Sequence, residues 1–583
     1  MMKFKKWAVI LFASFTLTMG CSDDDDVATE VPKDPENTTR PPNYITLLVD
    51  DMGFSDIGIN GGEISTPNID QLASEGIILD EFYAAPTSTP SRGMLFTGKD
   101  NHQSGVGNMA GWIADREEQI GQPGYEGVLS LEALPISEVL QGNGYETMIV
   151  GKWDLGEEPE YYPSNRGFDK TFVLLPGGDT HYLSDENGNV LSSQPPAAYA
   201  RLGRESLYNE NGQEFKDFPP YAYSSTYYTD KAIGMLDTRD KNKPFSLHVC
   251  YIAPHAPFQA PQEVTEKYID VYYAKGWDVI RQERFARLKE LGVIPQDAVQ
   301  PPRPDSVTAW NDLSEEDRRI EAKRMAVYAA MIEVLDDNIG RLVKHLREIG
   351  EYDNTVIFFM SDNGAAFLEA GSPAKQQYVS ENFTGLENYE NMGGPTSFIS
   401  ANEGWAMASN VPFTRYKGDT YEGGIHTAAF VHYPQSKVSG VKTDRLTSIM
   451  DIGATMVDMA DIQYPDTYKD KANIPLQGVS MAALFDGELS ADPTRWIAWE
   501  LDGLKGLRLG DWALSQKWND ETSCWDENWN LYNLANDPFE TTNLAETEPE
   551  KLQELQSLYD TYAEENGVIE VGPCPYGDED RVS

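Results

Sequence analysis

Four largely apolar stretches of strand length mark the first 360 residues of the chain. They cover residues 43–49, 144–152, 244–252 and 354–360. Apolar runs without polar alternation are typical of parallel strands buried on both faces of a sheet. A different pattern precedes the fourth run, because apolar residues recur at helical spacing within residues 314–348: Met325, Tyr328, Ile332, Leu335, Ile339 and Leu342. This alternation predicts an α/β fold in which helices flank a large, mostly parallel sheet.

The pattern changes after about residue 440. Short strands separated by turns are predicted at residues 496–500, 506–509 and 512–517, and a final helix at residues 550–566. Short strands followed by one helix are typical of a small α+β unit with an antiparallel sheet. We therefore expect a large domain over residues 42–440 and a smaller domain over residues 441–583.

The first 41 residues read as targeting and tether segments. Lys3, Lys5 and Lys6 precede an apolar run at residues 7–17, which is short for a membrane span. The following residues 18–21 resemble a lipobox, so residues 1–21 are expected to be a lipoprotein signal peptide whose Cys21 is lipidated. Residues 22–41 are then an acidic, proline-rich tether. The acidic run at residues 23–26 resembles the surface-export tag of some Gram-negative lipoproteins. These features predict an exported lipoprotein at the outer membrane surface or in the periplasm; plain secretion with a cleaved peptide is the alternative.

Charge restricts the partners. The chain has 46 basic and 94 acidic residues and a net charge of −48. Such a surface repels nucleic acid and anionic membranes, so no nucleic-acid partner is expected and a membrane only through the lipid anchor. Of the later cysteines, Cys250 ends an apolar run and is expected to be a buried free thiol. Cys524 and Cys574 are free to pair in an oxidising compartment, and we expect them to form a disulfide.

Oxygen-bearing side chains follow two of the predicted strands. Asp50 and Asp51 follow the first apolar run, and Asp362 and Asn363 follow the fourth. Open α/β sheets place ligands at the carboxyl ends of their strands. Hard oxygen donors without paired histidine or cysteine favour Ca²⁺, with Mg²⁺ as the alternative, over zinc. An ordinary loop or helix cap is the structural alternative for an Asp-Asp pair.

Residues 88–98 contain a candidate anion site. Pro90 suits the first turn of a helix, which places Ser88 at the N-terminus, where free N–H groups favour negative charge. Arg92 follows one turn later on the same face. By itself this stretch fits an ordinary capped helix better than an anion site.

The same stretch resembles the signature of the sulfatase family, [Cys or Ser]-x-Pro-Ser-Arg-x-x-Leu-x-Thr-Gly. The matching residues are Ser88, Pro90, Ser91, Arg92, Leu95, Thr97 and Gly98. The resemblance implies an alkaline-phosphatase-like sandwich and oxidation of Ser88 to 3-oxoalanine (formylglycine) by a maturation enzyme. It also implies a Ca²⁺ site made by Asp50, Asp51, Asp362, Asn363 and the modified Ser88.

Further matches extend the resemblance from about residue 42 to residue 567. They imply that Lys152 bridges formylglycine and sulfate, that His255 protonates the leaving oxygen, and that Lys417 is the second sulfate-binding lysine. Residues 531–544 match a structural C-terminal motif of the family. One departure concerns the family's usual Gly-Lys-Trp-His motif. In this chain the last position of the motif is Asp154 instead of histidine. Asp154 could replace the histidine as a base, contact the sugar, be structural, or mark a slow or lost second step. His426 stands where the family usually has arginine.

The sequence thus predicts a sulfuric ester hydrolase, with an exo-acting carbohydrate sulfatase on sulfated glycans as the leading hypothesis. Asp179 and His181 are candidate sugar contacts, although simple loop polarity explains them as well; His102 is expected in another loop near the site. Three alternatives remain open: an arylsulfatase on small aryl sulfates, a phosphate or phosphonate ester hydrolase, and a non-catalytic glycan-binding lipoprotein.

Overall fold

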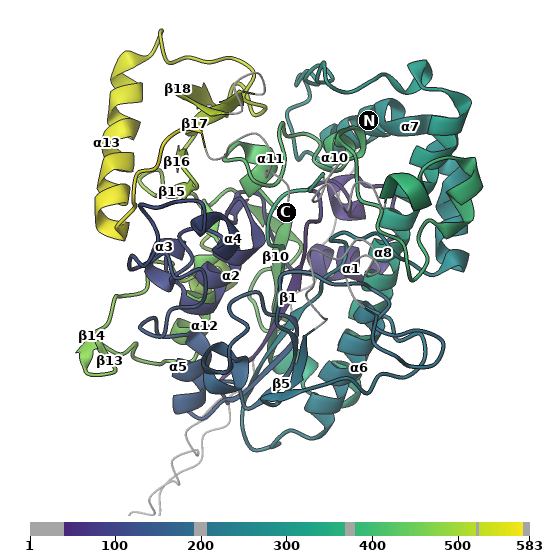
Figure 1. Cartoon of the computed structure of the whole chain (residues 1–583). Helices are drawn as coiled ribbons and strands as arrows, with labels where there is room; N and C mark the ends of the chain where they lie inside the picture. Colours follow the sequence, from purple (N-terminus) through teal and green to yellow (C-terminus); the bar gives the residue numbers. More distant parts are fainter. Residues whose placement is uncertain (1–39, 192–206, 368–378, 520–523, 575–583) are drawn as a thin grey trace, which may run out of the picture. The chain divides into compact units, whose positions relative to one another are not determined.

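The computed structural model describes residues 40–191, 207–367, 379–519 and 524–574 (Figure 1). Residues 41–583 form one compact unit, separate from residues 1–40. The predicted signal peptide and nearly all of the predicted tether lie outside the described residues. Within the described part of the chain, no helix is both long and apolar enough to cross a membrane.

A ten-stranded sheet forms the centre of this unit, in the order β11-β2-β10-β9-β1-β8-β4-β5-β6-β7. The strands from β9 to β5 run parallel, and β10, β6 and β7 add antiparallel pairs. Their bounds are β1 Asn43–Val49, β2 Ile77–Leu79, β4 Glu146–Lys152, β5 Lys170–Leu174, β6 Tyr208–Glu210, β7 Gln213–Glu214, β8 Phe245–Cys250, β9 Thr355–Ser361, β10 Ala429–His432 and β11 Val441–Thr443.

Helices cover both faces of this sheet. Successive side chains of β1 point to opposite faces, and each set packs against a different group of helices. Ile45, Leu47 and Val49 join a core with residues of α1 Pro67–Glu75, α6 Ser224–Asp237, α7 Gln262–Glu290 and α8 Glu315–Glu348. Tyr44 and Leu48 join a second core with residues of α2 Ser88–Thr97, α5 Ile136–Gly142 and α12 Met450–Met459. Shorter helices are α3 Asn101–Ser104, α4 Ala110–Ile113, α10 Glu403–Ser409 and α11 Glu422–Ile425. Two small ladders pair β3 Phe82–Tyr83 with β12 Thr447–Ser448, and β13 Thr467–Tyr468 with β14 Lys471–Ala472.

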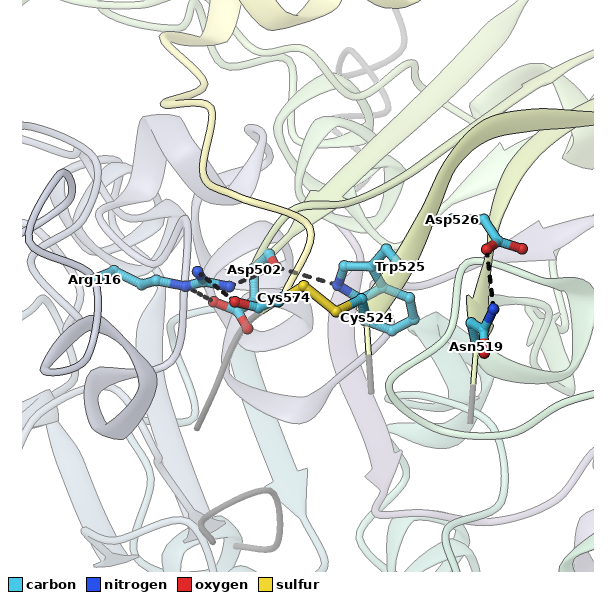
Figure 2. The surroundings of a disulfide bond; sticks show 7 residues. All are labelled: Arg116, Asp502, Asn519, Cys524, Trp525, Asp526 and Cys574. Atoms are coloured by element: carbon cyan, nitrogen blue, oxygen red, sulfur yellow. Dashed lines mark hydrogen bonds and ion pairs between the residues drawn. A yellow bond between two sulfur atoms is a disulfide. The ribbon is translucent and has the colours of Figure 1, made fainter. Parts of the chain in front are cut away.

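A four-stranded antiparallel sheet follows near the C-terminus. It consists of β15 Trp496–Leu501, β16 Leu504–Leu509, β17 Trp512–Asn519 and β18 Cys524–Asn533, and α13 Pro549–Asn566 packs against it. We call residues 496–574 the C-terminal sheet domain. Cys524 and Cys574 form a disulfide beside Trp525 and the Arg116–Asp502 ion pair (Figure 2). Both the predicted disulfide and the buried free thiol of Cys250 are present.

The predicted fold class is confirmed, with one difference in detail. β11 and α12 follow residue 440 but still belong to the large sheet and its core, so the change to the second sheet comes later than expected. Residues 160–235 contain β5, β6, β7 and α6. α7 consists of two helical segments that meet at Gly276, where φ is 61° and ψ is 176°.

Candidate active site

Most of the predicted site residues lie at the carboxyl ends of adjacent parallel strands. Asp50 and Asp51 follow β1, Lys152 ends β4, and Asp362 follows β9. His255 comes from the loop after β8, the strand between β1 and β4. Parallel strands end at the same edge of a sheet, so these side chains converge although up to 312 residues separate them.

Ser88 meets this cluster from helix α2. As predicted, it is the first residue of a helix that is buried throughout. Its Oγ donates to Asp50 Oδ1 at 3.1 Å and lies 3.3 Å from Asn363 Oδ1. One turn of helix later, Ser91 Oγ donates to the backbone oxygen of Asp362 at 2.6 Å, which fixes the helix start against the end of β9.

The acidic and amide oxygens form a compact, buried set. Asn363 Nδ2 donates to Asp51 Oδ1 at 2.7 Å, and the backbone N–H of Asp51 donates to Asp362 Oδ1 at 3.2 Å. Asp51 has a φ of 63°, a left-handed conformation that is uncommon outside glycine and turns the chain sharply after β1. Asp51 Oδ2 is buried and has no hydrogen-bond partner among the described residues. These oxygens are hard metal ligands, and one of them accepts no hydrogen bond from the described residues. The set therefore fits a Ca²⁺ or Mg²⁺ ion.

Three cationic side chains surround the oxygens. Lys152 Nζ lies 2.7 Å from Asp50 Oδ2, Lys417 Nζ lies 2.7 Å from Asp51 Oδ1, and Arg92 lies 3.0 Å from Asp362 Oδ2. Burial alone would raise the pKa of the Asp50 and Asp51 carboxyls. The positive charges of Lys152 and Lys417 outweigh this effect, so both pKa values lie below the ordinary aspartate value. The cluster is therefore charged at neutral pH and suited to binding ions of both signs.

His255 lies on the other side of Asp51. Its Nε2 is 3.6 Å from Asp51 Oδ2, and its Nδ1 is 2.5 Å from the backbone oxygen of Ala256. Asp50, Asp51 and His255 together can present ligand atoms within 4.8 Å of one another. Burial lowers the pKa of His255, with Asp51 and Asp50 opposing this shift. The Nδ1–H bond to a carbonyl leaves Nε2 directed at the cluster.

Asp154 lies beside the nucleophile candidate. It has a φ of 59°, and its Oδ2 accepts a hydrogen bond from Thr89 Oγ1 at 2.9 Å and lies 3.8 Å from Lys152 Nζ. A Cβ on Gly177 would approach Asp154 Oδ1 to 2.6 Å, so the loop before Gly178 leaves room only for a glycine there. The carboxylate is thus bonded to the residue that directly follows Ser88, and its side chain is 17% exposed.

Two predicted sugar contacts do not reach the surface. His181 is fully buried; its Nδ1 is 3.0 Å from Ser224 Oγ, and its Nε2 is 2.8 Å from the backbone oxygen of His255. Burial lowers the pKa of His181 to about 4, so the ring is neutral. Asp179 is also buried. His181 therefore lies beneath the loop that carries His255, and both side chains are withdrawn from the surface.

His102 also differs from the expectation. It is buried between Asp100 and Glu500, and Glu500 belongs to β15 of the C-terminal sheet domain. This histidine links two parts of the fold and is not bonded to any of the predicted site residues.

Sequence reasoning missed some residues that hold the site. Thr89 occupies a variable position of the signature, so only its bond to Asp154 reveals it. Asn410 accepts from the backbone N–H of Ala365 and donates to the backbone oxygen of Gly423, joining the end of β9 to the start of α11. No local pattern distinguishes such an asparagine from any other in a loop.

Comparisons with known proteins agree with this geometry. The model of the family described as Sulfatase matches residues 42–462. An uncharacterised sulfatase of Schizosaccharomyces pombe is 35% identical over 91% of this chain and 95% of its own length. An arylsulfatase of Klebsiella aerogenes is 33% identical over 76% of this chain and 92% of its own length.

The fold also has a solved counterpart. The crystal structure of Ps i-CgsB in complex with k-i-k-neocarrahexaose has a TM-score of 0.62 at 23% identity, over 90% of this chain and 94% of that chain. The family model covers well over half of the chain. The alignments with the two relatives cover nearly the whole length of each relative. The chain therefore belongs to the sulfatase family and is a sulfuric ester hydrolase.

Proposed function

We propose that this enzyme hydrolyses sulfate esters of carbohydrates, using a formylglycine made from Ser88 and a Ca²⁺ ion held by Asp50, Asp51, Asp362 and Asn363. One observation carries the proposal: Ser88 Oγ, four oxygen-bearing side chains and three cations meet at the carboxyl ends of neighbouring strands. Mg²⁺ is the alternative ion. Ca²⁺ would draw charge from the sulfate oxygens, and the hydrated aldehyde would supply the attacking hydroxyl.

The chain's own residues have separate roles in this proposal. Lys152 and Lys417 hold sulfate oxygens and offset their charge. Arg92 orients the site, because it donates both to Asp362 and to the backbone oxygen of Lys152, the latter at 3.0 Å. A protonated His255 would give the leaving oxygen a proton from Nε2, which an alkoxide requires more than a phenoxide does. Asp154, bonded to Thr89, accepts the proton of the second formylglycine hydroxyl when the sulfate is released.

A sulfated glycan is the substrate class we infer. A net charge of −48 disfavours anions everywhere except at the local cation cluster, so the sulfate must enter a narrow positive site. The fold accommodates oligosaccharides, since a fold neighbour was solved with a neocarrahexaose bound. Small aryl sulfates are the in-class alternative and should turn over as test substrates.

Partners and location follow from the sequence alone. We infer that a formylglycine-generating enzyme modifies Ser88, and that Cys21 carries a lipid that anchors the protein in the outer membrane. Residues 1–39, which carry this inference, lie outside the described part of the chain.

The decisive experiment is mass spectrometry of the peptide that contains Ser88. We expect a mass lower by two hydrogen atoms, as oxidation of serine to formylglycine requires. Ser88→Ala should lower the turnover of 4-nitrophenyl sulfate by at least about 10³-fold, since it removes the nucleophile. The matched control Ser557→Ala replaces an exposed serine of α13 and should keep full turnover.

Turnover retained in Ser88→Ala would refute the formylglycine mechanism. An unmodified Ser88 together with binding of a glycan but no turnover would favour the non-catalytic alternative. Faster hydrolysis of a phosphate or phosphonate ester than of the matching sulfate ester would favour the second enzymatic alternative.

A further inference from the structure

Lys417 belongs to a closed loop. We call residues 414–424 the Lys417 loop; its base is closed by the N–H of Gly423, which donates to the backbone oxygen of Thr414 at 3.0 Å. Lys417 lies inside the loop, and its Nζ contacts Asp51. The position of this ammonium therefore depends on what fixes the loop.

The Lys417 loop contacts the segment after Asn363 and the segment before Ser88. The N–H of Gly364, directly after Asn363, donates to the backbone oxygen of Gly424 at 2.9 Å. A Cβ on Gly364 would lie 1.8 Å from the backbone oxygen of Gly423, so the two backbones are already in contact. The N–H of Gly418 donates to the backbone oxygen of Pro86 at 2.7 Å, two residues before Ser88. A shift of the loop would therefore reach the oxygen cluster and the Ser88 helix.

The C-terminal sheet domain holds this loop at four points. Thr414 Oγ1 and Thr420 Oγ1 donate to the backbone oxygens of Phe539 and Lys505 at 3.3 and 3.0 Å. The hydroxyls of Tyr421 and Tyr532 are 3.0 Å apart. The N–H of Glu422 donates to Glu540 Oε2 at 2.8 Å. These contacts join positions more than 80 residues apart in the chain.

Glu540 is the most unusual of these anchors. It is 6% exposed, and its φ of 54° places it in the left-handed region. Non-glycine residues adopt that conformation rarely and at a cost. Burial, followed by the negative charge of Glu422, raises the pKa of Glu540 well above its ordinary value. The Glu422 carboxylate is bonded on its other side, by the Tyr83 hydroxyl at 3.0 Å and by His426 Nδ1 at 2.7 Å.

We propose that Glu540 is a positioning residue for sulfate hydrolysis: through the Glu422 N–H it fixes the Lys417 loop, and thereby Lys417, at the site. The C-terminal sheet domain thus shapes the sulfate site without touching the substrate. This inference rests on the proposed function only for the role of Lys417.

A double-mutant cycle on 4-nitrophenyl sulfate turnover tests the proposal. We expect Glu540→Ala to lower kcat/KM by about 10- to 100-fold, and Lys417→Ala to lower it further. Because Glu540 acts through Lys417, the double variant should lie within about threefold of Lys417→Ala alone. Losses that multiply in the double variant would overturn the proposal.

Conservative and matched variants separate positioning from general stability. Glu540→Gln keeps the length of the side chain and an oxygen that can accept from the Glu422 N–H, so it should keep at least about half of the wild-type kcat/KM. Glu554→Ala removes an exposed carboxylate of α13 in the same domain and should change neither kcat/KM nor the melting temperature. A Glu540→Gln variant as impaired as Glu540→Ala would overturn the proposal.

Amide hydrogen exchange gives a readout that does not depend on turnover. Glu540→Ala should speed exchange in residues 414–424 while α8 and the central strands keep wild-type protection. Uniformly faster exchange would indicate a structural role alone and overturn the proposal. Absence of turnover in the wild-type protein would instead refute the proposed function, a result distinct from any outcome for Glu540.

Discussion

At the scale of single residues, Asp154 is the position that sets this chain apart from the usual sulfatase pattern. A histidine is expected there from the family resemblance, and a carboxylate is present, bonded to Thr89 and near Lys152. Both an imidazole and a carboxylate can accept a proton. Its hydrogen bond to Thr89, the residue directly after Ser88, favours the base role over a purely structural one.

Replacing Asp154 should separate the two halves of the reaction. We expect Asp154→Asn to release alcohol in a burst and then stall, with steady-state turnover at least about 10²-fold lower, because the base for the second half is missing. Asp154→His should keep at least about a tenth of the wild-type rate. Stopped-flow measurement of alcohol release from an aryl sulfate checks this.

Other outcomes point to other roles for Asp154. Equal losses in the burst and in the steady state would contradict the base role. Loss of glycan turnover with normal aryl sulfate turnover would indicate a sugar contact. A lower melting temperature with normal kinetics would mean that the residue is structural.

Metal removal tests the oxygen cluster directly. Asp50, Asp51 and Asp362 are buried side by side, so a bound cation should stabilise the folded state. After chelation, adding Ca²⁺ at 100 times its Kd should raise the free energy of unfolding by about 2.7 kcal/mol. Asp51→Asn should abolish this gain, and the exposed control Asp511→Asn should keep it. Equal stabilisation of both variants would show only non-specific binding to an acidic surface.

At the scale of elements, His102 joins helix α3 to the C-terminal sheet domain. Its two ring nitrogens lie 2.8 Å from Asp100 Oδ1 and 2.9 Å from Glu500 Oε2, and the Tyr562 hydroxyl of α13 donates to Asp100. Burial alone would lower the pKa of His102, but the bonds to Asp100 and Glu500 raise it to about 9. The protonated ring thus bridges two carboxylates.

This bridge should make stability depend on pH. The folded-state pKa of His102 lies above the ordinary value of 6.5, so its contribution is complete below pH 6.5 and disappears as the pH rises through about 9. His102→Gln should cost about 3 kcal/mol of unfolding free energy at pH 6 and much less at pH 10. Urea unfolding at both pH values measures this. The matched control His345→Gln on α8 should show a small loss, and an equal loss for His102→Gln at both pH values would contradict the prediction.

The same scale shows which elements the sequence could predict. β1 begins and ends as expected at residues 43 and 49, and α8 differs from its predicted range by one residue. β1 is buried on both faces, and α8 has a Ser314 cap and an apolar stripe, so local signals suffice. β6 and β7 are only three and two residues long and pair at the sheet edge, which leaves little local signal.

At the scale of the whole molecule, the C-terminal sheet domain is fastened to the rest of the compact unit. Trp499 Nε1 donates to the backbone oxygen of Ala84 at 2.9 Å, close to the Ser88 helix. The disulfide secures the tail after α13 to β18, next to the Arg116–Asp502 pair (Figure 2). The N–H of Trp525 donates to the backbone oxygen of Pro573 at 2.7 Å, which continues this attachment.

Counting thiols tests the disulfide. In protein that starts at residue 22 and is denatured without reductant, we expect one reactive thiol, that of Cys250. Cys574→Ser should lower the free energy of unfolding by about 2–4 kcal/mol, since a closed segment of 50 residues is released in the unfolded chain. Cys250→Ala serves as the control that leaves the disulfide intact. Three reactive thiols in the unmodified chain would contradict the pairing.

The sequence by itself determined the α/β class, the strand ends that carry Asp50, Asp51 and Asp362, and the helix that begins at Ser88. These features depend on local signals: continuous apolar runs, helical spacing and one short signature. Only the tertiary structure decided that His181 is buried beneath His255, that Thr89 holds Asp154, and that Glu540 holds the Lys417 loop. Such contacts join residues 65 to 118 positions apart, and packing, not local propensity, selects them.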